Sequence, residues 1–252
     1  MDNIYLVQRT FQYDYIYFDA VFLIIWIAVL IYKKEHRALL FAVAVSPLIY
    51  FIDAYVWWNS KIGDTYVREY WINGVQVPHP VGNYFVTKFG ADFMMTISYS
   101  LFTFAWIWIF FKYFRSNKTI IPIKYAILWL SFWIFTPALS IMAKINDSTV
   151  YAVRHMQSQY FIWILATIIS YFVLAFVYKK EKVIVLKLFC AGFVAVIIME
   201  FPLFVFNIRQ MGFKILIFDG FFMINQAIPA LYIFYDKVLM KRFNFPKNIF
   251  PI

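Results

Sequence analysis

The chain alternates between long apolar runs and short polar segments. Seven runs reach or approach the roughly 20 residues that a helix needs to cross a bilayer. They lie at about 16–32, 38–58, 89–111, 120–142, 157–178, 184–207 and 214–235. Apolar runs of this length with few charges are typical of transmembrane helices. The pattern therefore predicts an all-α, polytopic membrane protein with seven transmembrane helices and one membrane domain, 1–252.

The amino-acid composition also indicates a membrane protein, and it limits the kinds of site that the chain can form. The chain is 64% hydrophobic and 14% charged, whereas a soluble domain is about half apolar and a quarter charged. Residues 1–17 lack a basic region followed by a small-residue cleavage site, so we expect no signal peptide. The single Cys190 excludes a disulfide framework and a paired-cysteine metal site. We expect no metal and no cofactor.

The basic residues predict the orientation in the membrane. Four segments, 32–37, 112–124, 179–187 and the tail from Lys237, hold 15 of the 23 lysines and arginines. By the positive-inside rule these segments are cytoplasmic, so we expect the N-terminus outside and the C-terminus in the cytoplasm. The chain would then be a multi-pass protein of the cell membrane. The net charge of +10 then reflects topology, not binding to nucleic acid. Residues 60–88 become an outer loop, either interfacial or a lid.

Two parts of the chain share an ordered set of features. Tyr-Lys-Lys-Glu follows the first span at Tyr32 and the fifth span at Tyr178; an acid, an aromatic-Asn pair, a glycine and a further Asp then follow in each part. Such order predicts a 3+1+3 parallel repeat. The first repeat covers 1–111 with the outer loop, 120–142 is the connector helix, and 157–235 is the second repeat. This layout is similar to that of SWEET-type sugar transporters and PnuC-type vitamin transporters.

Acidic residues within the outer part of the spans are the candidate functional groups. A carboxylate in apolar sequence is costly unless it faces a cavity or a partner. The candidate catalytic residues are Asp53, Asp92, Glu200 and Asp219. Helix capping is the alternative for Asp92 and for Asp19, which lie near the starts of their spans. Candidate substrate-binding residues on the same faces or next to them are Trp57, Trp58, Tyr99, Phe204, Phe222, Asn225 and Gln226.

The sequence lacks the residues that three common kinds of membrane-protein site require. The seventh span has no internal lysine for a retinal Schiff base, since Lys214 and Lys237 lie at its ends. No His/Cys cluster has zinc-ligand spacing. No Asp-Asp-x-x-Asp run is present to bind a diphosphate through magnesium.

The second span ends in Asp53 and Trp57-Trp58-Asn59, and the seventh contains Asp219-Gly220. This pattern resembles the small seven-span cyclases of isoprenoid metabolism, namely bacterial and archaeal lycopene cyclases and fungal meroterpenoid cyclases. It departs from them in having Asp53 where the meroterpenoid cyclases have Glu, and in lacking the Pro-x-Glu-Glu motif of the lycopene cyclases. The resemblance implies a metal-independent cyclase in which Asp53 or Asp219 protonates an isoprenoid substrate and aromatic faces stabilise the cation.

Two further function classes fit the same residues. The acids could form the binding site of a carrier for a small cationic or polar solute, with or without proton coupling. The chain could also be a sensor or assembly subunit without chemistry. The layer of acids near one surface fits a one-sided active site better than a transport site at the midplane. We therefore expect an integral membrane enzyme of isoprenoid or lipid metabolism.

Overall fold

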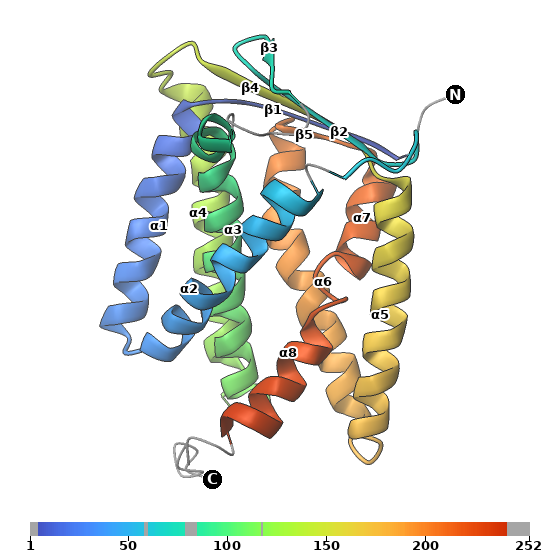
Figure 1. Ribbon diagram of the computed structural model, residues 1–252. Coiled ribbons are helices and arrows are strands. Elements are labelled where there is room, and N and C mark those ends of the chain that lie inside the picture. The colour runs from blue at the N-terminus through green and yellow to red at the C-terminus, as the bar shows by residue number, and fades with distance from the viewer. Residues whose placement is uncertain (1–4, 58–59, 79–84, 117, 241–252) are drawn as a thin grey trace.

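Helices dominate the structure, and a small sheet covers one end of their bundle (Figure 1). The computed structural model describes residues 5–57, 60–78, 85–116 and 118–240, without the side chains of residues 54 and 85–95. The α-helices are α1 (Asp14–Tyr32), α2 (His36–Phe51), α3 (Phe85–Tyr113), α4 (Ile120–Met142), α5 (Gln157–Val177), α6 (Lys182–Val205), α7 (Phe213–Phe222) and α8 (Ile228–Phe234). Two π-helical segments, η1 (Ile52–Trp57) and η3 (Tyr235–Leu239), extend α2 and α8.

Among the described residues, five helices are long and apolar enough to cross a membrane: α1, α2 together with η1, α4, α5 and α6. The chain is therefore a multi-pass membrane protein. The helix α3 and the pair α7 and α8 lie along the same bundle (Figure 1). The observed ends of α4 and α5 lie within a residue of the predicted spans 120–142 and 157–178, because apolar runs of bilayer length have few alternatives to a helix.

The last predicted span, 214–235, is divided into two helices. Here α7 ends at Phe222, and α8 begins only at Ile228 with Pro229 in its first turn. Proline has no N–H to donate to the preceding turn, so it favours the start of a new helix. Asn225 occupies the break, where its Nδ2 donates to the carbonyl of Phe221 at 3.0 Å. The prediction of one continuous helix was wrong at this point.

The all-α prediction was also wrong, because a five-stranded antiparallel sheet is present. Its strands are β1 (Leu6–Gln12), β2 (Val67–Ile72), β3 (Val75–Gln76), β4 (Thr149–His155) and β5 (Arg209–Gln210), in the order β3-β2-β4-β1-β5. Part of the predicted outer loop 60–88 forms the hairpin β2–β3. Asn73 and Gly74 make its turn with φ of 51° and 79°, the conformation that a two-residue hairpin turn requires.

The strand pairing joins the two parts of the chain. The strand β1, which precedes α1, pairs with β5, which follows α6. Conversely β4, which precedes α5, pairs with β2, which follows α2 and η1. The central pair is β1 with β4. The pairs β1–β4, β1–β5 and β2–β4 therefore each contain one strand from the first half of the chain and one from the second.

Buried aromatic side chains fill the bundle away from the sheet. Trp26 of α1 stacks on Phe102 of α3 with 5.0 Å between ring centroids. Trp133 of α4 donates from its indole N–H to the carbonyl of Met199 in α6 at 2.9 Å. Further buried aromatic residues on α3, α4, α8 and η3, and in the turn after α3, are Trp106, Trp108, Phe111, Phe114, Trp129, Tyr232 and Tyr235. Open space is found instead at the end that the sheet covers.

Candidate ion-pair network and cavity

The sheet presents four arginines to the helices. Register places Arg68 of β2 directly opposite Arg154 of β4, and Arg9 of β1 directly opposite Arg209 of β5. Arg9 also lies opposite Ala152, two residues from Arg154. Opposite residues and residues two apart share one face of a sheet. All four arginines therefore belong to the same face, and Arg9, Arg68 and Arg209 are buried.

Like charges directly opposite each other destabilise a sheet, so this arrangement needs anions. Asp53 on η1 provides one. Its carboxylate accepts hydrogen bonds from both terminal nitrogens of Arg68, at 2.9 and 3.0 Å, and its main-chain carbonyl accepts a third at 2.8 Å. Such a two-pronged pair fixes geometry as well as charge. It ties the end of the second membrane helix to the sheet.

Arg209 bridges two further acids. One terminal nitrogen donates to Glu200 of α6 and the other to Asp219 of α7 at 2.9 Å. The three side chains are only 3%, 1% and 0% exposed, respectively. Burial opposes the charge of Arg209, but the two carboxylates outweigh it and raise the pKa of Arg209 above its ordinary value. The two carboxylates therefore hold Arg209 in its charged form inside the protein.

A cavity of about 440 Å³ lies between this cluster and the helices. Its volume is within the usual range for small-molecule sites. The charged lining residues are Arg9, Asp53, Arg154, Glu200 and Arg209. The uncharged polar ones are Thr96, Tyr99, Ser100, Thr103, Gln159 and Gln226. The rest of the wall is mainly apolar and includes Ile49, Ile52, Trp57, Phe104, Trp163, Met199, Met223 and Ile224. One cavity therefore combines a charged end with an apolar wall.

Arg154 differs from its neighbours in its surroundings. Within the described part of the chain, no carboxylate lies at ion-pair distance from it, and its side chain is partly exposed where it lines the cavity. Burial, together with the nearby Arg68, lowers the pKa of Arg154 from its ordinary 12.5 to about 10. The guanidinium thus stays charged at neutral pH in a place that disfavours a cation.

Other polar atoms beside the cavity also lack partners. Among the residues that the structure describes, nothing hydrogen-bonds to the Tyr99 hydroxyl or to Glu200 Oε2. The guanidinium of Arg9 lies over the Tyr99 ring, 5.7 Å from its centroid. A buried polar group without a partner is costly, so these atoms favour a polar ligand in the cavity.

The predicted site residues fall into three groups. Asp53, Trp57, Tyr99, Glu200 and Gln226 line the cavity, and Asp219 lies beside it through Arg209. Three predicted residues do not line it: Phe204, Phe222 and Asn225. Trp58 and the side chain of Asp92 lie outside the described residues.

The three that do not line the cavity have packing roles. Phe222 packs on Phe218 with 4.6 Å between centroids, and Phe204 pairs with Phe213. Asn225 accepts a hydrogen bond from the Tyr171 hydroxyl at 2.7 Å. These contacts join α5, α6 and α7 without reaching the charged end of the cavity.

Asp19 has a different environment from the other acids. It is fully buried and accepts a hydrogen bond from the Ser98 hydroxyl at 2.9 Å. No ion pair to Asp19 is found across the described ranges. This environment does not match the helix-capping alternative, because the partner is a side chain on another helix.

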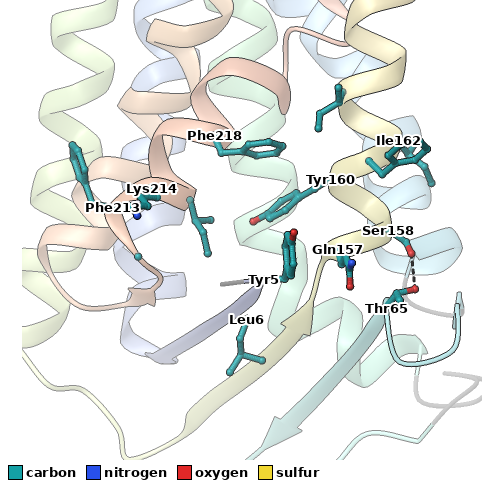
Figure 2. Close-up of a pocket in the computed structure, with 14 residues that line it drawn as sticks. Tyr5, Leu6, Thr65, Gln157, Ser158, Tyr160, Ile162, Phe213, Lys214 and Phe218 are labelled. Atoms are coloured by element: carbon teal, nitrogen blue, oxygen red, sulfur yellow. Dashed lines mark hydrogen bonds between the residues drawn. The ribbon is translucent and has the colours of Figure 1, made fainter. Parts of the chain in front are cut away.

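A second hollow, a groove of about 1200 Å³, lies between the starts of α5 and α7. Figure 2 shows Tyr160 and Phe218 side by side in its lining, with Tyr5 beneath Tyr160 and the Thr65–Ser158 hydrogen bond at its rim. The centroids of Tyr160 and Phe218 are 4.7 Å apart. Ser158 and Tyr160 line the groove, whereas Gln159 and Trp163 line the cavity. The first turns of α5 therefore separate the two spaces.

The arginines were missed by the sequence interpretation, which treated basic residues as markers of topology. Their signal was the alternation Val7-x-Arg9-x-Phe11, in which an arginine holds an inward position of a strand. The described residues contain no group of three His, Cys, Asp or Glu side chains that could hold a metal ion. Fold and site together define a multi-pass membrane protein with a cavity beneath an arginine-bearing sheet. Comparison of the chain with family models, curated proteins and solved structures finds no match.

Proposed function

We propose that the chain is an integral membrane enzyme that acts on a lipid or isoprenoid substrate. The observation that carries this proposal is the cavity, where Arg9 and Arg154 lie at one end and Phe104 and Met223 belong to the apolar wall. A lipid has the same division between a polar head and an apolar chain. The apolar groove between α5 and α7 supports lateral entry from the bilayer, because Phe161 and Phe213 at its edge are 68% and 60% exposed.

A one-sided site favours an enzyme over a carrier. A carrier exposes its site to each side of the membrane in turn. Here the buried aromatic cluster around Trp106, Trp129 and Tyr232 fills the bundle beyond the cavity. This packing leaves the carrier alternative with less support than a site reached from the sheet side or from the lipid.

The ion pairs of the three acids affect whether these acids can initiate the cyclisation that the resemblance to cyclases implies. Acid-initiated cyclisation needs a protonated carboxylic acid. Asp53, Glu200 and Asp219 each accept hydrogen bonds from an arginine, which favours the ionised carboxylate, whereas the burial of Glu200 and Asp219 opposes it. Within the proposal these acids hold the arginines and orient the substrate, and a cyclisation initiated by one of them is the less favoured reaction.

The strand pairing supports the proposed seven-span, parallel-repeat architecture. A two-fold axis through the β1–β4 pair would exchange β1 with β4 and β2 with β5, and hence Arg9 with Arg154 and Arg68 with Arg209. The acids Asp53 and Glu200 would exchange as well, because each is the carboxylate at the end of the second helix of its half. Active sites formed on such an axis lie between the repeats.

Lipid that co-purifies with the protein tests the proposal. Ala227 lines the cavity, so Ala227→Phe should fill it and displace bound lipid. Ala230→Phe is the matched control, since Ala230 is exposed on α8. Native mass spectrometry should detect a retained lipid or isoprenoid on the unmodified protein and on the control, and a large loss in Ala227→Phe. Equal retention by both variants would refute a lipid site in this cavity.

A further inference from the structure

We infer that the cavity binds an amphiphile with an anionic oxygen headgroup, a phosphate or a carboxylate, held between Arg154 and Arg9. This inference rests on the proposed function and adds the charge of the ligand. The tail of the amphiphile lies along the apolar wall that Phe104, Met223 and Ile224 form.

The position of Arg154 is the first argument. It shares its face of the sheet with three other arginines, of which Arg68 and Arg209 form ion pairs with acids on η1, α6 and α7. Arg154 has no described carboxylate at ion-pair distance, yet it points into a cavity with room for one. An arginine fork presents parallel donors that match the oxygens of a phosphate or carboxylate. A bound anion would supply the missing counter-charge.

The surrounding donors are the second argument. The Tyr99 hydroxyl lies among Arg9, Arg154, Arg209 and Glu200 and has no hydrogen-bond partner in the described ranges. An O–H group can donate to an anionic oxygen, as can a guanidinium. Tyr99, Arg9 and Arg154 all line the cavity, so donors from β1, β4 and α3 converge on one space.

The acids in the lining set the orientation of the ligand. Asp53 and Glu200 also line the cavity and would repel an anion, but each accepts hydrogen bonds from its own arginine. These pairs leave the Arg154 side as the electropositive part of the charged end. The apolar residues of α2, α3 and α7 lie on the remaining wall. We therefore expect the headgroup of the ligand to lie at Arg154 and its tail to lie along the apolar helices.

Native mass-spectrometric titration with dodecyl phosphate, dodecanol and inorganic phosphate tests the inference. Arg154→Gln should weaken dodecyl phosphate binding by about 10- to 100-fold, the size of one charge-assisted hydrogen bond, and leave dodecanol binding unchanged. Lys144→Gln removes the same charge on the sheet side, from an exposed residue paired with Asp147, and should bind like the unmodified protein. Arg154→Lys retains the charge and should lie between, which also separates a binding defect from misfolding.

Each result bears on one part of the inference. Equal binding of dodecyl phosphate by Arg154→Gln and the unmodified protein would overturn it. Dodecanol binding as tightly as dodecyl phosphate would overturn the anionic headgroup but leave the proposed lipid site intact. Inorganic phosphate binding as tightly as dodecyl phosphate would support the anion site and overturn the tail. Absence of all three ligands, with lipid retained equally by Ala227→Phe, would refute the proposed function itself.

Discussion

Replacement of Arg209 by methionine removes the cation between Glu200 and Asp219, which are 1% and 0% exposed in their side chains. Breaking a buried ion pair by removing one partner costs about 3–5 kcal/mol, because the other charge stays buried without compensation. At roughly 2–4 °C per kcal/mol for a chain of this size, Arg209→Met should lower the unfolding temperature by roughly 6–20 °C. Thermal unfolding in a mild detergent, followed by tryptophan fluorescence, measures the shift.

Two variants make this prediction specific. Arg115 pairs with Glu181 at 3.3 Å, but their side chains are 45% and 53% exposed, so Arg115→Met should cost only about 0–1 kcal/mol. Adding Glu200→Gln and Asp219→Asn to Arg209→Met removes the uncompensated charges and should recover most of the loss. If Arg209→Met unfolds within a few degrees of Arg115→Met, or if the triple variant is no more stable than the single one, the ionic description of the cluster is wrong.

Three further predictions concern the fold. In a cysteine-free background, a cysteine at Ser60 should react with an impermeant label from outside and one at Lys118 only from the cytoplasm; the reverse result would invert the topology. Gly192→Ala should destabilise the protein by about 1–3 kcal/mol, because the added methyl would overlap the Asn225 amide, and an unchanged unfolding temperature would contradict that packing. Asp19→Asn should unfold at an equal or higher temperature, since a neutral amide of nearly the same shape replaces a fully buried carboxyl group; a large loss would reveal a cationic partner.

The helices could be predicted from the sequence because each depends on one local property, an apolar run of bilayer length. The boundaries of α1, α4, α5 and α6 agree with the predicted spans to within about two residues. The division between α7 and α8 was less apparent, although Pro229 marks it. A proline within an apolar span can produce either a kink or a new helix, and tertiary contacts such as those of Asn225 decide which.

The sheet could not be predicted in the same way. Its strands are short, and their inward positions hold Arg9, Arg68 and Arg154 in place of the apolar residues that alternation normally uses. The turn Asn73-Gly74 between β2 and β3 was the one strong local signal, and it was interpreted as part of a loop. The other pairings join distant segments, which a pattern along the chain does not reveal.

The acids of the candidate site were visible, but their partners were not. A carboxylate within an apolar run is rare because its burial in a membrane costs free energy, so Asp53, Glu200 and Asp219 could be identified from sequence alone. An arginine in a polar segment between spans has no such cost until the fold buries it. Arg209, for example, lies in a two-residue strand, and only the fold shows that it bridges two acids.

The crossed strand pairing also determines when the site can form during synthesis. Arg9 and Arg209 lie opposite each other in the sheet, although they are 200 positions apart in the sequence. Closing so long a loop is slow relative to local helix formation. The strand β1 can therefore pair with β5 only after the sixth long helix has entered the membrane. Premature termination before β5 would leave a nascent chain with inserted helices and an open sheet edge, the state that quality-control proteases and chaperones recognise.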